Sequence, residues 1–194
     1  MTSSSVSRVA TDQRQSAFAA LTIAFSGDPI MRWLYPEASD YLANFPGFLE
    51  AYAGKSIGAK TAWRLGQSSA VALWLPPHVD VDGDAFVRHM IDTVAPEKHD
   101  DLVSVVTQMD AAHPLVPIWY LAILGVDVAL QGQGLGAVLM AHVLGIVDGD
   151  HVPAYLDSSN PRNVPFYERH GFAVVGEARA GTAPPVISML RPAR

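Results

Sequence analysis

The sequence predicts an α/β (α+β) domain in which a mixed sheet is flanked by helices, and three observations lead to this prediction. Apolar runs of strand length alternate with segments of helical period along the chain. Hydrophobic residues make up 49% of the sequence and charged residues only 16%, so a sizeable core can form. The length of 194 residues fits one domain of the usual size, about 100–200 residues.

The first part of the chain predicts helices. Residues 1–10 are polar and rich in serine, so we expect a flexible N-terminal segment before a folded domain at 11–194. A helix should extend from about residue 11 to residue 26, because Gly27-Asp28-Pro29 ends it. Ile30–Ser56 is rich in aromatic residues and is interrupted by proline and glycine. This composition favours short helical pieces over a pocket rather than one long helix.

A hairpin and two helices should follow. Lys60–Leu65 and Ala70–Leu75 are short runs of β type, and the segment between them predicts a turn. Helices are expected at Asp84–Thr93 and Pro96–Ala112. The connection between these helices is too short to be a linker between two domains.

The second half of the chain alternates strands with helices. The strands are expected at Trp119–Val128, Pro153–Leu156, Phe172–Glu177 and Val186–Leu190. The helices are expected at Gly134–Val147 and Pro161–His170. The last two strands resemble a hairpin, which indicates a mixed sheet rather than a fully parallel one.

Charge and residue content exclude several classes of function. With 13 basic and 19 acidic residues, the net charge of −6 argues against a nucleic-acid partner, which needs clustered Lys and Arg. The chain has no cysteine, so disulfides, thiolate nucleophiles and Cys-ligated zinc are excluded. Its histidines show no paired spacing, and no metal site is predicted. No stretch approaches the about 18 apolar residues of a membrane span, so we expect a cytoplasmic protein without membrane contact.

A glycine-rich loop lies between the strongest predicted strand and its helix. Gln131-Gly132-Gln133-Gly134-Leu135-Gly136 lets the backbone approach a ligand closely, and free N–H groups at a helix N-terminus favour an anion such as a diphosphate. The P-loop is excluded, because no Gly-Lys-Ser/Thr follows. A dinucleotide fingerprint is a competitor: Gly132, Gly134 and Ala137 satisfy G-x-G-x-x-A, and Asp157 follows at a strand end. This alternative predicts an NAD(P)-type oxidoreductase, although too few strands and helices follow for a doubly wound sheet.

A second block of residues bears on this choice. Asn160-Pro161-Arg162-Asn163-Val164-Pro165-Phe166-Tyr167-Glu168-Arg169-His170-Gly171-Phe172 reads as a capped helix followed by Gly-Phe before a strand. Together with Val126 and the glycine-rich loop, this block resembles the GCN5-related N-acetyltransferase (GNAT) superfamily. The resemblance implies the GNAT fold, a single domain whose mostly antiparallel sheet is splayed between two central strands.

Two further patterns are similar to one group within that superfamily. His113-Pro114 precedes Trp119-Tyr120-Leu121, and Asp28-Pro29-Ile30-Met31-Arg32-Trp33-Leu34 lies early in the chain. Both resemble the puromycin N-acetyltransferase-like bacterial enzymes. Asp157 stands where those enzymes more often have glutamate, which bears on the base and the substrate rather than on the fold.

The resemblance implies acetyl-CoA as co-substrate and direct transfer of acetyl to a primary amine in a ternary complex. By position, the backbone of Leu124 and Val126 should bind the pantetheine, and the loop amides should bind the diphosphate. The implied cofactor-binding residues are Leu124, Val126, Gln131, Gly132, Gln133, Gly134, Leu135, Gly136, Ala137 and Asn160. Asn160 has an equally good alternative role as a local helix cap.

The resemblance also indicates an acid and a base. Tyr167 is the expected general acid, because a phenol near pKa ~10 can protonate a departing thiolate near ~8.5. Asp157 is the first candidate for the base, ahead of Asp127, Glu37 and His113. The expected partner is a small-molecule amine, bound by a monomer or a homodimer. A non-catalytic acyl-CoA-binding module on the same fold is the remaining alternative.

Overall fold

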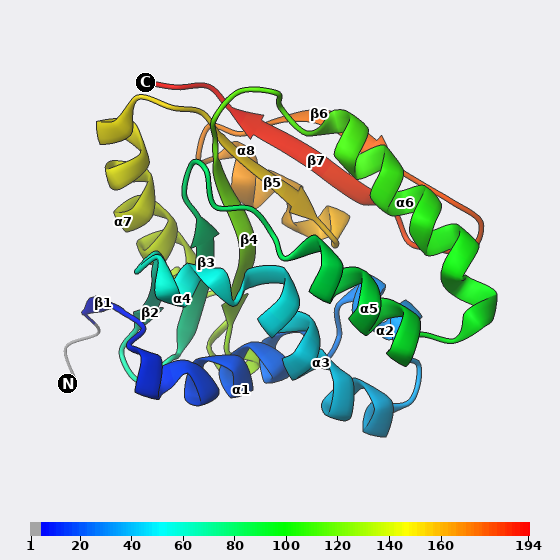
Figure 1. Ribbon diagram of the computed structural model, residues 1–194. Coiled ribbons are helices and arrows are strands. Elements are labelled where there is room, and N and C mark those ends of the chain that lie inside the picture. Colours follow the sequence, from blue (N-terminus) through cyan, green and yellow to red (C-terminus); the bar gives the residue numbers. More distant parts are fainter. Residues whose placement is uncertain (1–4) are drawn as a thin grey trace.

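Seven strands form one mixed sheet with helices on both faces in the computed structural model, which describes residues 5–194 (Figure 1). The strands are β1 (Val6–Arg8), β2 (Ala62–Leu65), β3 (Ala70–Leu75), β4 (Trp119–Val126), β5 (Ala154–Ser158), β6 (Ala173–Ala178) and β7 (Val186–Arg191). Their order across the sheet is β1-β2-β3-β4-β5-β7-β6. Every neighbouring pair is antiparallel except β4 and β5. The predicted α/β class with a mixed, mostly antiparallel sheet is confirmed.

The helices lie close to their predicted positions. They are α1 (Arg14–Ala24), α2 (Pro29–Leu34), α3 (Ala38–Ala53), α4 (Lys55–Gly58), α5 (Gly83–Thr93), α6 (His99–Ala112), α7 (Leu135–Asp150) and α8 (Val164–Glu168). Short 3₁₀ turns at Thr11–Gln13, Pro96–Lys98, Val128–Leu130 and Pro161–Asn163 precede α1, α6, α7 and α8.

One helix is longer than the sequence predicts. The expectation of only short pieces across Ile30–Ser56 is wrong at α3, which continues for 16 residues through Pro46. Pro46 lacks the N–H that would bond the carbonyl of Leu42, and Leu42 is 61% exposed, so water can reach that turn. The buried face of α3 offsets the ~3 kcal/mol that proline costs in a helix. That face consists of Tyr41, Phe45, Phe48, Leu49, Ala51 and Ala53.

An edge strand lies inside the segment expected to be flexible. Val6–Arg8 pairs antiparallel with β2, and the Arg8 guanidinium lies 5.1 Å from the centre of the Trp63 ring. Three residues are too short a run to show a strand period in the sequence, so this pairing was not predicted. The first part of the expected flexible segment, residues 1–4, lies outside the described residues.

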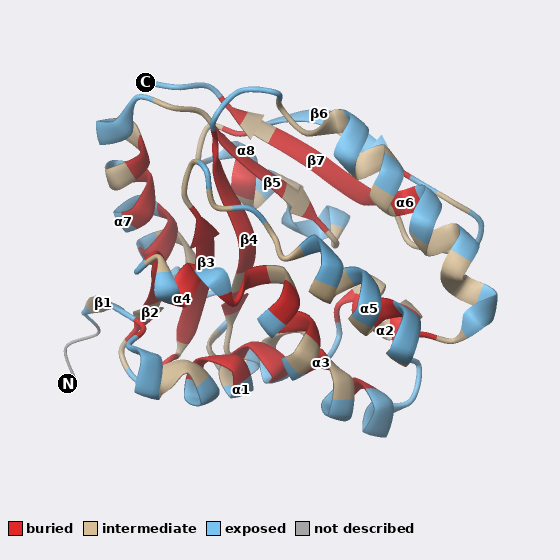
Figure 2. Cartoon of the chain, viewed as in Figure 1, coloured by how far each residue is buried: buried red, intermediate tan, exposed pale blue. Residues whose placement is uncertain are grey.

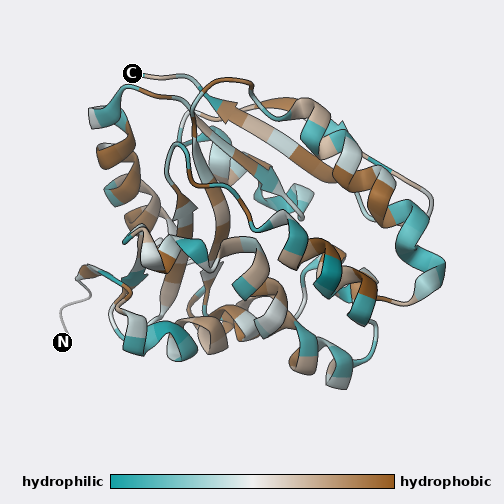
Figure 3. Cartoon of the chain, viewed as in Figure 1, coloured by the Kyte–Doolittle hydropathy of each residue, from teal (hydrophilic) through white to brown (hydrophobic). Residues whose placement is uncertain are grey.

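The sheet separates two hydrophobic cores. One core joins α1–α5 to one face, where Tyr120 and Tyr155 point, and the other joins α7 and α8 to the opposite face, where Leu121 and Leu156 point. Figure 2 shows the resulting line of buried residues along β3, β4 and β7, and Figure 3 shows that the central strands are largely hydrophobic. At Gly125, α1 approaches so closely that an added Cβ would lie 2.9 Å from the Cβ of Ala24.

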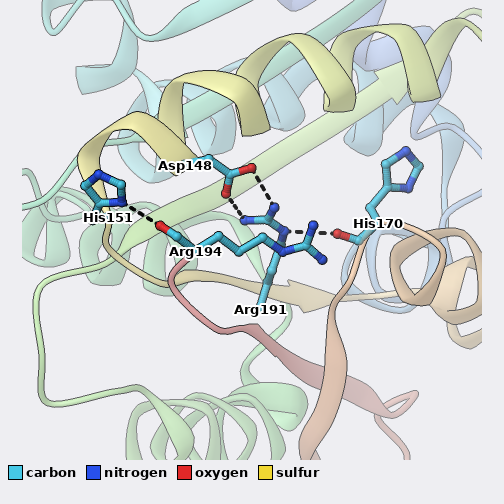
Figure 4. A network of polar contacts seen from close by, with 5 residues as sticks. All are labelled: Asp148, His151, His170, Arg191 and Arg194. Carbon is cyan, nitrogen blue, oxygen red and sulfur yellow. Dashed lines mark hydrogen bonds and ion pairs between the residues drawn. The ribbon is translucent and has the colours of Figure 1, made fainter.

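An ion pair ties the C-terminal end of α7 to the sheet. Arg191 on β7 donates from both terminal nitrogens to the Asp148 carboxylate, at 2.6 and 2.9 Å, and from Nε to the carbonyl of His170 (Figure 4). The Arg191 side chain is only 3% exposed. Nearby, a ring nitrogen of His151 contacts the carbonyl of Arg194 at 2.6 Å. These contacts fix the far end of the helix whose N-terminus carries the glycine-rich loop.

Candidate active site

The two central strands separate part-way along their length. β4 and β5 are paired only where Trp119–Leu121 lies beside Ala154–Leu156. Beyond that point β4 continues beside β3, while β5 continues beside β7. Asp157 is the first residue of β5 past the last pair, so it lies where the gap between the strands opens.

A bulge in β4 determines which backbone groups face this gap. Leu73 lies opposite Ile123 but Trp74 lies opposite Leu121, which leaves Ala122 as an extra residue. The N–H of Trp119 donates toward β5, to the carbonyl of Pro153 at 2.9 Å. Eight residues later, an even number, the N–H of Asp127 donates toward β3, to the carbonyl of Ser69 at 3.0 Å.

In an unbroken strand, residues an even number apart direct their polar groups to the same side. The bulge reverses that alternation, so the N–H and C=O groups of Leu124 and Val126 point into the gap. One of them is already a demonstrated acceptor there, since Gln131 Nε2 donates to the carbonyl of Val126 at 3.3 Å.

The glycine-rich loop has the backbone geometry of an anion site. Gly132 and Gly134 have φ of +76° and +80°, and a Cβ at either position would meet nothing within 4 Å. Within residues 5–194, no amide from Gln131 to Ala137 donates a hydrogen bond. These free amides lie at the N-terminus of α7, where the helix dipole favours negative charge.

Asn160 acts as a local cap. Its Oδ1 accepts a hydrogen bond from the amide of Arg162 at 3.1 Å, as the capping alternative predicts. Asn163, three residues later, lines the cavity described below.

Asp157 lies inside a cage of hydroxyl groups. Its Oδ1 accepts from Ser188 Oγ at 2.6 Å and from Tyr155 Oη at 3.2 Å, and its Oδ2 accepts from Tyr120 Oη at 3.1 Å. The hydroxyl of Tyr120 is also hydrogen-bonded to that of Tyr52 on α3. Burial raises the pKa of Asp157, although the three hydrogen bonds act in the opposite direction. A carboxylate with a raised pKa is a better proton acceptor near neutral pH.

Tyr167 reaches the same region from the other face of the sheet. It is 8% exposed and packs edge-on against Phe166 and Phe172, with ring centres 5.1 and 6.1 Å apart. Burial, followed by the charge of Asp28, raises the pKa of Tyr167. The phenol therefore stays protonated at neutral pH, as an acid must before it donates.

A cavity of about 810 Å³ connects these groups. Its lining includes Leu124, Asp157 and Tyr167 together with apolar side chains from α2, α3, α5 and α6. The base candidate on one face of the sheet and the acid candidate on the other thus share one space, because the gap between β4 and β5 joins the two faces.

The other base candidates are placed differently. Asp127 caps the turn at Val128–Leu130 by accepting from the amide of Ala129 at 2.9 Å. Glu37 lies exposed at the start of α3, outside the cavity. His113 does line the cavity, and its ring lies 5.0 Å from that of Tyr155.

The sequence pattern did not indicate the partners of Asp157. Tyr52, Tyr120, Tyr155 and Ser188 come from α3, β4, β5 and β7, and no spacing along the chain relates them. For Tyr155 alone there was a signal, since residues two apart on a strand share a face with each other and Asp157 follows at that spacing.

The structure also bears on metals and membranes. Among residues 5–194, no group of three His, Asp or Glu side chains is arranged to hold a metal ion. No helix in the same range is long and apolar enough to span a membrane.

Comparison with known proteins decides the family. The family model described as "Acetyltransferase (GNAT) domain" matches residues 86–189, more than half of the chain. The chain belongs to the GNAT acetyltransferase family. An uncharacterized N-acetyltransferase of Schizosaccharomyces pombe is 24% identical over 184 residues, which cover 85% of this chain and 72% of the yeast protein.

Solved GNAT structures share the fold. A Corynebacterium glutamicum protein described as histone acetyltransferase HPA2 and related acetyltransferase superimposes with a TM-score of 0.70 at 22% identity, covering 99% of this chain and 97% of that one. Arylalkylamine N-acetyltransferase 2 of Aedes aegypti gives 0.70 at 14% identity, covering 97% and 98%. The Drosophila melanogaster polyamine N-acetyltransferase gives 0.65 at 16% identity, covering 96% and 98%.

Membership settles the reaction class. The single-domain GNAT fold is confirmed, and the protein is an acyltransferase of a family whose enzymes use acetyl-CoA. The oxidoreductase alternative is wrong. A doubly wound dinucleotide-binding sheet is mostly parallel, whereas this GNAT sheet contains one parallel pair.

Proposed function

We propose that the protein is an acetyl-CoA-dependent N-acetyltransferase that acetylates a primary amine of a small molecule by direct attack in a ternary complex. The observation that carries the proposal is the single cavity lined by both Asp157 and Tyr167 at the point where β4 and β5 separate. Fold neighbours named for arylalkylamine, agmatine and polyamine acetylation support a small-molecule amine as the acceptor.

The proposed co-substrate site combines two backbone surfaces. The gap-facing groups of Leu124 and Val126 suit the amides of a pantetheine chain, and Val126 would exchange its hydrogen bond with Gln131 for one to the ligand. The free amides from Gln131 to Ala137 suit a diphosphate. Asn160 retains its cap through Oδ1, so its amide nitrogen is the group proposed to reach the ligand. When bound, acetyl-CoA supplies the thioester acyl carbon, to which the amine nitrogen adds as the C–S bond breaks.

Asp157 and Tyr167 are proposed to move the two protons. Asp157 accepts a proton from the acceptor ammonium, and its raised pKa suits that role. Tyr167 donates its hydroxyl proton to the departing thiolate, and its burial keeps it protonated until then. Because the two residues lie on opposite faces of the sheet, the base cannot be consumed by the acid's proton.

We also propose that the domain comprises residues 11–194, in a monomer or a homodimer, and that its functional relatives are puromycin N-acetyltransferase-like enzymes. Three motif residues support the latter. His113 and Tyr120 line the cavity, and Asp28 caps α2, whose side chains also line it.

A binding and turnover experiment tests the proposed function. Acetyl-CoA should raise the melting temperature of the protein, whereas NAD⁺ should not, and thiol release should depend on an added amine. Binding of acetyl-CoA without thiol release across a broad panel of primary amines would instead establish an acyl-CoA-binding module.

A further inference from the structure

The cavity selects among amines by charge and by shape. We propose that the acceptor is a primary amine with an apolar body about the size of an aromatic ring and with no carboxylate or phosphate group. This inference rests on the proposed function and specifies the substrate class of the same site.

The first reason is the charge of the lining. Asp80, Asp110 and Asp157 line the cavity, whereas no Lys or Arg of the described chain does. Asp80 and Asp110 are exposed, so they act at the mouth, and Asp157 alone lies inside. An acceptor ammonium is attracted at both places, but an acidic group on the acceptor would lose its hydration without finding a cation.

The second reason is the number of hydrogen bonds that Asp157 can still accept. A carboxylate has about four lone-pair sites, two on each oxygen. Tyr155 and Ser188 use both sites of Oδ1, and Tyr120 uses one site of Oδ2. One site on Oδ2 remains, which fits a single N–H of one ammonium group.

The third reason is the wall opposite Asp157. Phe48 and Tyr52 of α3 stack with ring centres 5.2 Å apart, and Phe86 of α5 lies 5.9 Å from Phe48 and 5.4 Å from Tyr52. All three line the cavity. An apolar body gains free energy by leaving water here, whereas a second ammonium inside the cavity would have no carboxylate of its own.

The test compares acceptors that differ in one group. L-phenylalaninamide and L-phenylalanine share the side chain and the reacting amine, but only the second carries a carboxylate. With saturating acetyl-CoA, kcat/KM from thiol release should favour the amide by at least about a hundredfold, since an unpaired buried charge is costly. 2-Phenylethylamine should exceed ethylamine and spermidine by at least about tenfold each, because only the first fills the apolar wall with a single cation.

A variant pair locates the effect in the cavity. Met109 of α6 lines the cavity and is partly buried. Met109→Lys adds the missing cation and should reduce the preference for phenylalaninamide over phenylalanine by about tenfold, whereas the matched neutral control Met109→Gln should preserve it.

The outcomes separate the two proposals. Equal use of phenylalanine and its amide, or better use of spermidine than of phenylethylamine, overturns the substrate class while the acetyltransferase function stands. Thiol release from none of these amines, with acetyl-CoA binding intact, overturns the proposed function and this inference with it.

Discussion

Replacing Asp157 with asparagine removes the proposed base while keeping the shape of the side chain. Asn Oδ1 can still accept from Tyr155 and Ser188, so the hydroxyl cage should remain largely in place. Loss of a general base typically slows turnover by about 10²–10⁴. An alkylammonium has a pKa near ~10, so only about one molecule in 10³ is free amine at pH 7. The rate of the variant should therefore rise about tenfold per pH unit between pH 7 and 9.

The wild-type enzyme should behave differently with pH. Because burial raises the pKa of Asp157, the carboxylate that accepts the proton is lost as pH falls through that raised value, and activity should fall with it. The assay is thiol release at saturating acetyl-CoA from pH 5 to 9, with melting temperature as a check on folding. Asp150→Asn is the matched control, since Asp150 accepts from the Trp119 indole at 2.9 Å and lies outside the cavity. A pH–rate profile of Asp157→Asn that coincides with the wild type would refute the role of Asp157 as base.

Three further predictions address the loop, the acid and the ion pair. Gly134→Asp places a charge among the free amides and should weaken acetyl-CoA binding at least about tenfold by calorimetry, roughly 1.4 kcal/mol, whereas the uncharged Gly134→Asn should lose less. Equal affinities of these two variants would contradict a diphosphate at this loop. Tyr167→Phe should lower turnover about a hundredfold with acetyl-CoA affinity nearly intact, and normal turnover on two amines of different basicity would return the residue to a structural role. Asp148→Asn leaves the Arg191 guanidinium almost buried and without its counter-ion, so denaturant unfolding should show a loss of about 2–3 kcal/mol, below the ~3–5 of a fully buried pair because Asp148 is 35% exposed. The hydrogen bond from Arg191 lowers the pKa of Asp148, so this stabilisation is present above the ordinary carboxyl pKa near ~4 and should disappear as pH falls through the depressed value. An unfolding free energy with the same pH dependence in Asp148→Asn as in the wild type would exclude the pair as its source.

Local features of this protein could be predicted from the sequence, and features that depend on two distant segments could not. The glycine-rich loop and the capped helix at Pro161–His170 are set by residues within one turn of each other, and both lie where the pattern predicted them. The edge strand β1 has its partner more than fifty residues away, in Ala62–Leu65.

The site shows the same division. Leu124 and Val126 were chosen by resemblance, but their orientation depends on the extra residue Ala122, which exists only relative to the register of β3. The hydroxyl cage of Asp157 likewise joins Tyr52 of α3 to Ser188 of β7, and hydrophobic period carries no information about such a meeting.

The separation of the two cores by the sheet has a consequence for how this enzyme can diverge from its relatives. Phe48 and Tyr52, which form the acceptor wall, belong to the core of α1–α5, whereas Tyr167 and the N-terminal turns of α7 belong to the other. Substitutions in the acceptor wall thus leave the second core untouched, and distant sites usually change stability independently. The match to the family at residues 86–189 begins after α3, so the wall lies in the part of the chain that is free to vary while the chemistry is inherited.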